Sequence, residues 1–228
     1  MHGYTLYGGG VTRSAVVEAL LRELDRPYDL VAVDPLRGEN RTPAYLKLNP
    51  AGFVPTLVTP EGEALHETVA MLIYLGDRHG DKGLAPGPSD ASRGRYLARL
   101  LYLNNDIDGR TKSFFYPHRW SSDAADAPRI RDAAYEAIME RWRVYDTWLA
   151  EDGPYALGAT FTIADMFMAL WAAYGLRETD DITRRFVHVA RCYDAVVARP
   201  KGGPPIASVR EALDRWKATG GMDGRVSR

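Results

Sequence analysis

Two helix starts in this sequence carry side chains that can hold an anion. Glu67 and Thr68 stand where a predicted helix begins, and Tyr7, Thr12 and Ser14 place three hydroxyl groups around the start of an earlier one. Free backbone N–H groups at a helix N-terminus bind carboxylates and other anions, and a hydroxyl there adds a further donor. The same residue types are also ordinary helix caps. The sequence therefore predicts either plain capping or the binding of a negatively charged ligand at these two points.

Other kinds of chemistry lack a matching pattern. The five histidines show no metal-ligand spacing such as HxxxH, so we assign no metal. The glycines Gly8–Gly10 match neither GxGxxG nor the phosphate-binding motif that ends in lysine. The single cysteine, Cys192, stands among apolar residues of a predicted helix, and we interpret it as a buried structural thiol.

The elements that position these residues change in type along the chain. Up to about residue 80, strand and helix patterns alternate, whereas after residue 90 the apolar residues recur at helical spacing. Between these parts, residues 81–90 are rich in glycine and proline, which is typical of a linker. The sequence therefore predicts two domains, 1–80 and 91–219, followed by a disordered tail over 220–228.

The first domain is predicted to hold one small mixed sheet covered by helices. Its expected elements are a strand over Tyr4–Tyr7, a helix from Thr12, a strand over Tyr28–Val33, hairpin strands over Thr56–Thr59 and Glu63–Leu65, and a helix from about Thr68. The first two strands are expected to be parallel, because the segment between them is too long for a hairpin turn.

The second domain is predicted to be entirely helical. Its expected helices run from Ser92 into the 110s, from about Ile130 to Trp148, over Thr162–Tyr174, over Arg184–Arg199 and over Ile206–Lys217. The third of these starts with a capping box, in which Thr162 and Asp165 each bind a backbone N–H group at the start of the helix.

The composition narrows the classes of function. Among 228 residues, 46% are hydrophobic and 26% are charged, and 29 basic against 30 acidic side chains give a net charge of −1. These values are typical of a folded chain, and they indicate no general attraction to nucleic acid or to an anionic membrane. The sequence shows neither a signal-peptide pattern nor a run of about 18 apolar residues, so we expect a soluble cytoplasmic protein.

Three motifs resemble those of the cytosolic glutathione S-transferases, and they follow the order and spacing of that family. They are NPAGFVPTL at 49–57, LHETVAMLIYL at 65–75 and GATFTIAD at 158–165. The resemblance implies an α/β N-terminal thioredoxin-like domain that binds glutathione and an all-α C-terminal domain that forms the acceptor-substrate site. It also implies a homodimer that uses glutathione as co-substrate, a small apolar electrophile as acceptor, and no metal.

The first two motifs imply how glutathione binds. The proline of the first motif is cis in the family, and the backbone of Val54, before Pro55, pairs with the cysteinyl part of the ligand as an added strand. An ordinary turn proline is the alternative. In the second motif, Glu67 takes the amine and Thr68 the carboxylate of the γ-glutamyl end, with helix capping as the alternative.

The glycyl end of the ligand is implied to meet Asn40, Arg41 and Phe53. Asn40 and Arg41 match a family segment that often contacts the glycine carboxylate, although Arg41 fits a solvated surface arginine equally well. Phe53 stands where many members have lysine or glutamine. An apolar ring weakens polar recognition there, so a related thiol is an alternative to glutathione itself.

The catalytic position is implied by the segment Leu6–Ser14, which resembles the L-Y-G-x-P-x-S-R-x pattern of bacterial members with a serine or threonine at the active site. The match places Thr12 at the catalytic hydroxyl and Arg13 after it. Gly10 replaces the usual proline, so a shift by one residue would put Val11 in the catalytic position and leave Thr12 as a helix cap. Two other hydroxyls remain as alternatives, Tyr7 and Ser14.

The chemistry implied at this position is activation of the ligand's thiol. Only the thiolate is nucleophilic, and lowering a thiol pKa from about 8.5 to about 6.5 requires roughly 2.7 kcal/mol of differential stabilisation. No cysteine lies near this segment, which argues against the reduction of mixed disulfides.

The acceptor pocket is expected where the second domain faces the first. An aromatic cluster follows the first long helix and supplies Phe115, Tyr116 and Arg119, with Val11 on the facing loop. Core packing around a bend at Pro117 is the alternative. The resulting hypothesis is a transferase of alkyl or aryl groups. A glutathione-dependent isomerase or lyase, and a non-catalytic binding or regulatory protein, are the alternatives.

Overall fold

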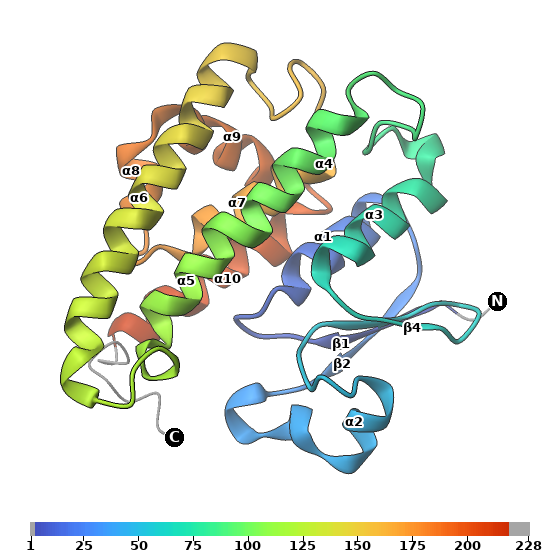
Figure 1. Cartoon of the computed structure of the whole chain (residues 1–228). Helices are drawn as coiled ribbons and strands as arrows, with labels where there is room; N and C mark the ends of the chain where they lie inside the picture. Colours follow the sequence, from blue (N-terminus) through green and yellow to red (C-terminus); the bar gives the residue numbers. More distant parts are fainter. Residues whose placement is uncertain (1–2, 219–228) are drawn as a thin grey trace.

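The structure is a computed structural model, and it describes residues 3–218. The tail predicted over 220–228 lies outside the described residues. Within them the chain forms a small sheet with helices on both faces, followed by a larger bundle of helices (Figure 1). The predicted fold class, a thioredoxin-like α/β domain followed by an all-α domain, is confirmed.

The sheet holds four strands in the order β2-β1-β3-β4. Their bounds are Tyr4–Gly8 for β1, Tyr28–Ala32 for β2, Thr56–Val58 for β3 and Ala64–Leu65 for β4. β1 is parallel to β2 and antiparallel to β3, and β3 and β4 form the predicted hairpin. Tyr4 and Leu6 of β1 are buried while their neighbours are partly exposed, as the alternation of a strand requires.

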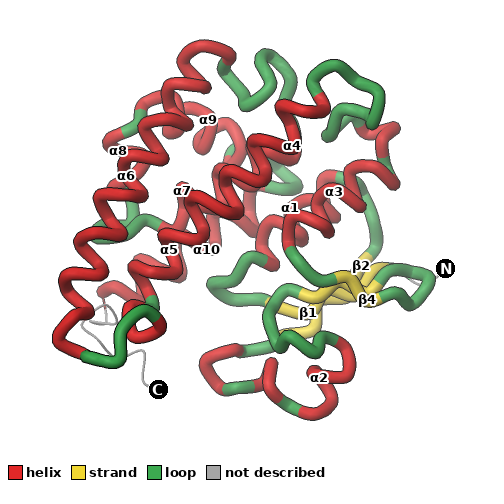
Figure 2. The backbone as a smooth tube through the Cα atoms, viewed as in Figure 1, coloured by secondary structure: helices red, strands yellow, loops and turns green. Residues whose placement is uncertain are grey.

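Helices α1 (Ser14–Glu23) and α3 (Thr68–Arg78) cover one face of the sheet, and the short α2 (Pro43–Leu48) lies on the other (Figure 2). Helix α2 was not predicted from the sequence. The residues that favour its start are local: Thr42 accepts a hydrogen bond from the Tyr45 N–H, and Pro43 occupies the first turn.

Helix α1 begins at Ser14, two residues after the predicted start. The Thr12 carbonyl accepts the Ala15 N–H, and the Thr12 hydroxyl accepts the Ser14 N–H, so Thr12 lies in the turn that leads into the helix, before the N-cap residue Arg13. The apolar positions of α1 are fully buried, because the helix lies between the sheet and helices of the second half.

The second half is helical throughout, as predicted. Its main helices are α4 (Arg93–Tyr102), α5 (Asp108–Phe115), α6 (Ala127–Asp152), α7 (Ile163–Tyr174), α8 (Asp181–Arg185), α9 (Val187–Val197) and α10 (Gly203–Ala218). A π-helical turn over Leu103–Ile107 joins α4 to α5, so the predicted long helix is continuous but wider at its centre.

The helix predicted over Arg184–Arg199 is wrong as a single element, because the chain is extended at Phe186 and divides it into α8 and α9. The break has a cause distant in sequence. The Asp146 carboxylate, from α6, accepts the N–H groups of His188 and Val189 at 2.8 and 2.9 Å and so caps α9. The residues near 186 do not predict this cap, because the capping side chain lies in another helix.

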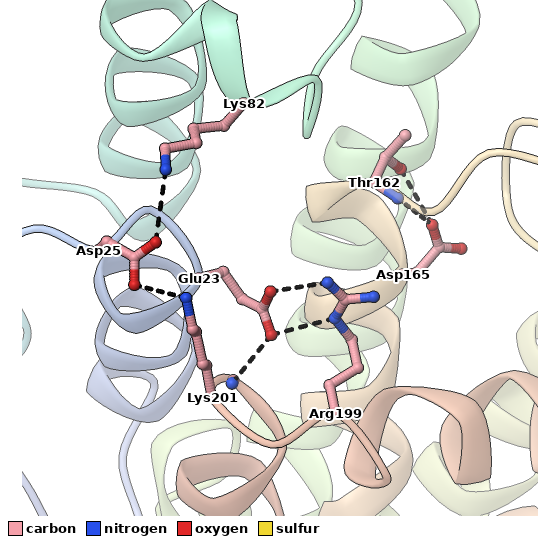
Figure 3. A network of polar contacts seen from close by, with 8 residues as sticks. Glu23, Asp25, Lys82, Thr162, Asp165, Arg199 and Lys201 are labelled. Atoms are coloured by element: carbon pink, nitrogen blue, oxygen red, sulfur yellow. Dashed lines mark hydrogen bonds and ion pairs between the residues drawn. The ribbon is translucent and has the colours of Figure 1, made fainter.

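Helix α7 forms the centre of the second half, with eleven of its twelve residues buried. The predicted capping box is confirmed: Asp165 Oδ2 accepts the Thr162 N–H at 2.7 Å and the Thr162 hydroxyl at 3.0 Å (Figure 3). Cys192 is buried and its Sγ lies 3.6 Å from Asp165 Oδ1, while burial raises the pKa of the thiol. The interpretation of Cys192 as a structural thiol is confirmed.

No helix within residues 3–218 is both long and apolar enough to cross a membrane. In the same range, no group of three histidine, cysteine, aspartate or glutamate side chains is arranged to hold a metal ion.

Candidate functional site

One small pocket gathers residues from three separate segments of the first half. Its lining residues are Arg13, Asn49, Ala51, Phe53, Val54, Pro55, His66, Glu67 and Thr68. Six of these were singled out from the sequence. They come from the start of α1, the loop before β3 and the start of α3, so the fold of the sheet is what brings them together.

The loop before β3 presents an unpaired stretch of backbone to this pocket. The Val54–Pro55 peptide bond is cis. Among the described residues, no hydrogen bond involves the N–H or carbonyl of Val54, so both groups are available to an extended chain laid against them.

Several side chains behind the pocket hold this loop in place. The Phe53 carbonyl accepts hydrogen bonds from Tyr45 Oη at 2.7 Å and from Asn49 Nδ2 at 2.8 Å. Asn40, predicted to contact the ligand, is instead buried, and its Nδ2 donates to the Gly52 carbonyl at 2.6 Å. The structure therefore places Asn40 behind the loop, outside the pocket lining.

Arg41 and Phe53 meet at the edge of the pocket. The Arg41 guanidinium lies 5.7 Å from the centre of the Phe53 ring and donates to the Ala51 carbonyl at 3.2 Å. Phe53 is about half exposed, at 53%. Arg41 does not line the pocket, although it lies beside two residues that do.

The side chains of Glu67 and Thr68 do not cap α3. No side-chain hydrogen bond caps the start of α3. Glu67 has a φ of 66°, in the left-handed region that non-glycine residues seldom adopt and that is often found at functional sites. Thr68 is buried, and its Oγ1 has no hydrogen-bond partner among the described residues. A buried hydroxyl without a partner costs about 1–3 kcal/mol, so this geometry favours ligand binding over capping.

The hydroxyls of the Gly9–Ser14 loop are bonded to one another and to the loop itself. Thr12 Oγ1 lies 2.7 Å from Ser14 Oγ and donates to the Gly9 carbonyl at 3.0 Å, while the Gly9 N–H donates to Ser14 Oγ at 2.7 Å. The packing is tight, since a Cβ on Gly8 would lie 2.5 Å from the Ser14 Cβ. Neither hydroxyl lines the pocket, although Arg13 between them does.

Tyr7 lies apart from these hydroxyls. It lines a larger groove, of about 550 Å³, between β2 and α2, and its ring contacts that of Tyr45 edge to face at 6.2 Å. This groove shares no residue with the pocket. The structure therefore does not bring Tyr7 together with Glu67 and Thr68.

The four residues predicted for an acceptor site line neither the pocket nor the groove. Phe115 packs against Tyr174 with ring centres 6.5 Å apart, and the Tyr174 hydroxyl donates to the Val11 carbonyl at 3.3 Å. Tyr116 and Arg119 contact each other, with the guanidinium 4.2 Å from the ring centre. Tyr174, which links Val11 to Phe115, was missed because its position at the end of a predicted helix carries no signal of its own.

Comparison with known sequences agrees with the fold. Residues 14–78 match the model of the glutathione S-transferase N-terminal domain. Glutathione S-transferase 2 of Anopheles gambiae is 30% identical over 205 residues, which are 87% of this chain and 91% of that one. An uncharacterised GST-like protein of Escherichia coli K12, YncG, is 29% identical over 75% of this chain and 81% of its own length.

Other relatives carry a different name. Elongation factor 1-gamma 1 of Oryza sativa subsp. japonica is 28% identical over 76% of this chain, and the match covers 41% of that longer protein.

Solved structures show the same architecture. A sphingomonad glutathione S-transferase complexed with glutathione is 26% identical and superposes with a TM-score of 0.73 over 95% of this chain and 98% of its own. A Sulfitobacter homologue with bound glutathione, 23% identical, shows the same fold with a TM-score of 0.75 over 96% and 99%. The chain belongs to the glutathione S-transferase family.

Proposed function

We propose that this protein binds glutathione, or a closely related thiol, and activates the thiol for attack on an electrophilic carbon of a small apolar acceptor. The observation that carries the proposal is the buried Thr68 hydroxyl, which lines the pocket without a partner. Glu67 and the free backbone of Val54 stand in the same pocket. A γ-glutamyl-cysteinyl chain offers a carboxylate, an amine and a peptide unit that complement these three features.

The ligand would lie along the pocket with its γ-glutamyl end at the start of α3. Thr68 and the first N–H groups of α3 would bind its carboxylate, and the Glu67 carboxylate would bind its amine. The backbone of Val54 would pair with the cysteinyl unit. The glycyl end would lie beside Phe53 and Arg41, where a ring and a guanidinium accept a methylene group and a carboxylate.

The sulfur would then face the Gly9–Ser14 loop, where Thr12 is the proposed thiol-activating residue. Its hydroxyl hydrogen goes to the Gly9 carbonyl, so the Ser14 hydroxyl is the donor in the contact between the two hydroxyls, and Thr12 would keep that bond when its hydrogen turns toward the sulfur. The thiol proton leaves to solvent, the sulfur lone pair forms the bond to carbon, and the leaving group departs with its electron pair. Tyr7 is a weaker alternative because it lies in the separate groove.

The acceptor would bind between the Gly9–Ser14 loop and the end of α5. Val11 and Phe115 are partly buried against the core at this point, and Tyr116 and Arg119 follow one and four residues after Phe115. An apolar acceptor with one polar group suits this set of side chains.

The test has two parts. Retention on immobilised glutathione measures binding, and the ultraviolet absorbance of the bound thiolate against pH measures activation. We expect retention, and a thiolate that titrates below the pKa of free glutathione. Thr12→Val should raise that pKa without abolishing retention. Absence of both retention and thiolate would refute the proposal, whereas an unchanged titration in Thr12→Val would refute only the assignment of Thr12.

A non-catalytic glutathione-binding protein is the second candidate. It is favoured by the Thr12 and Ser14 hydroxyls, which already have partners within their own loop, and by relatives that are named elongation factor 1-gamma rather than transferase. Retention on glutathione with no shift of the thiol pKa would identify this case. A glutathione-dependent isomerase or lyase would show the shift but no transfer to standard aryl halide acceptors.

We also propose that the protein is a homodimer. The expectation comes from its family, in which the thiol site lies near the subunit interface. Sedimentation equilibrium should give about twice the chain mass of 25.4 kDa, and a single-chain mass at micromolar concentration would contradict it.

A further inference from the structure

We propose that Asp108, on α5 of the helical half, is a positioning residue that acts through Arg13 on the thiol site. The inference rests on the proposed function, since it concerns how the same pocket binds its ligand. It goes beyond that proposal because it makes a buried carboxylate of the second half part of a site whose lining comes wholly from the first.

Arg13 is the residue through which the two halves meet at the pocket. It directly precedes α1 and lines the pocket, with 19% of its side chain exposed. Its Nη1 donates to Asp108 Oδ2 at 3.0 Å. A guanidinium has five N–H donors in a rigid plane, so fixing one of them fixes the direction of the rest.

Asp108 is almost inaccessible, with 4% of its side chain exposed. The same Oδ2 atom also lies 2.7 Å from the Lys112 Nζ, one turn further along α5. A buried carboxylate is stable only when it is paired, and here two cations share it. Lys112 is 45% exposed and does not line the pocket, whereas Arg13 does. The three groups together carry a net charge of +1, and the cation at the pocket is Arg13.

A second contact from the helical half holds the same loop. The Tyr174 hydroxyl, from α7, donates to the Val11 carbonyl at 3.3 Å, and Tyr174 is partly buried against the core, which raises the pKa of its hydroxyl. Residues 11–13 are thus tied to α5 and α7 at two points. The loop that would receive the ligand's sulfur takes its position from the second half.

When Asp108 is neutralised, a purely electrostatic role and a positioning role predict opposite changes in glutathione affinity and in the pKa of the bound thiol. Asp108→Asn removes a negative charge near the pocket, so electrostatics by itself would tighten the binding of anionic glutathione and lower the pKa of its thiol. If Asp108 acts by holding Arg13, the same change weakens binding and raises that pKa. The direction of the change in affinity and in thiol pKa therefore distinguishes a positioning role from a purely electrostatic one.

The experiment measures glutathione affinity by isothermal titration calorimetry, together with the thiolate titration described above. We expect Asp108→Asn to weaken binding about tenfold, a loss typical of one charge-assisted contact. Lys112→Gln is the matched control, because it removes the other cation on the same oxygen, and it should change affinity less than about twofold. In an Arg13→Gln background, Asp108→Asn should have no further effect.

The outcomes are distinguishable. A wild-type protein that does not bind glutathione refutes the proposed function. If the wild type binds but Asp108→Asn binds equally well or more tightly, or weakens binding further in the Arg13→Gln background, the inference is wrong. Should Asp108→Asn fail to fold by circular dichroism, Arg13→Lys answers the same question, because it keeps the charge but loses the planar fork. Its affinity should fall between those of the wild type and Arg13→Gln, and wild-type affinity would overturn the inference.

Discussion

At the scale of single residues, Thr68 is a side chain that is suited to a ligand but lowers the stability of the free protein. Its hydroxyl is buried and unpartnered, and the Nδ1 atom of neighbouring His66, also in the pocket lining, is in the same state. Buried polar groups almost always find partners, and the ligand proposed for this pocket would supply one to each of these two atoms.

Thr68→Val should therefore separate stability from binding. Valine keeps the shape and removes a hydroxyl that has no hydrogen-bond partner within residues 3–218, so the free energy of unfolding should stay the same or rise. Glutathione affinity should fall about tenfold, because the ligand carboxylate loses a donor. Thr68→Ser, which keeps the hydroxyl, is the control. Calorimetry and urea denaturation check the two parts, and equal affinities in Thr68→Val and Thr68→Ser would contradict the assignment.

Asp165 differs from Thr68, because its carboxylate accepts several hydrogen bonds within the protein. Burial raises the pKa of its carboxyl to about 6, although hydrogen bonds from the N–H groups of Ala156 and Thr162, from the Thr162 hydroxyl and from the Cys192 thiol oppose the rise. The ordinary pKa of an aspartate carboxyl, which we take for the unfolded chain, is 3.8. Between these values the folded state holds the proton more tightly, so this group's contribution to stability falls as the pH rises.

The prediction for Asp165 concerns the difference in stability between the wild type and Asp165→Asn. The advantage of the wild type should be largest below about pH 4 and should shrink by up to roughly 3 kcal/mol as the pH rises to about 6, because asparagine does not ionise. Above pH 7 the difference should be constant. Urea denaturation across this range is the measurement, and an advantage that grows with pH would show that the carboxylate is instead stabilised in its charged form.

At the scale of elements, the C-terminal end of α1 is joined to the turn between α9 and α10 by two ion pairs of unequal burial (Figure 3). Glu23 binds Arg199 through both oxygens, at 3.0 and 2.7 Å, and also accepts the Gly202 N–H. Its side chain is only 7% exposed. Asp25 binds Lys201 and Lys82, and its side chain is 53% exposed.

Glu23→Gln should cost about 3–5 kcal/mol of unfolding free energy, because it leaves Arg199 without its partner in a partly buried place. Asp25→Asn, a matched change two residues away, should cost less than about 1 kcal/mol. Burial opposes the ionisation of Glu23, but the hydrogen bonds from Arg199 and Gly202 outweigh it and lower the pKa of the carboxyl. Urea denaturation of both variants is the measurement.

The pH dependence of Glu23 gives the opposite sign to that of Asp165. Because its folded pKa lies below the ordinary glutamate value of 4.5, which we take for the unfolded chain, the stabilisation is complete above that pH and is lost as the pH falls through the folded pKa. The deficit of Glu23→Gln should accordingly shrink in acid. Equal deficits in Glu23→Gln and Asp25→Asn would show that burial does not distinguish the two pairs.

At the scale of the whole molecule, α1 packs against both halves. One continuous cluster of buried apolar side chains runs from the sheet through α1 into the helical bundle. Helix α1 packs on α3 and the sheet on one side and on α7 and α10 on the other. A helix shared in this way cannot leave one half without exposing the apolar surface of the other.

The two halves should therefore unfold as one cooperative unit. Native-state hydrogen exchange in increasing urea should give the slowest amides of β1 and of α7 the same free energy of opening, within about 1 kcal/mol. The comparison is direct, because each element is central to its own half. If β1 exchanged through an opening that spares α7, the thiol-binding half would be an independent unit, and its coupling through Asp108 would be correspondingly weak.

What the sequence determined by itself was mostly local. The alternation of β1, the apolar spacing of α1, the Thr162–Asp165 capping box and the turn between β3 and β4 are set by residues within a few positions of one another. These patterns predicted a small mixed sheet covered by helices and a helical second part, and the three motifs implied the thioredoxin-like fold class. Together with the three motifs, they also named most of the residues that line the pocket.

Only the tertiary structure decided which of these groups are free to act. Asp146 caps the start of α9 from 42 residues away, and Asp108 holds Arg13 from 95 residues away. The face of β1 that carries Tyr7 opens into a different groove, and the Thr12 hydroxyl is occupied while that of Thr68 is not. Hydrogen-bonding partners of this kind depend on packing between distant segments, which the spacing of residues along the chain does not encode.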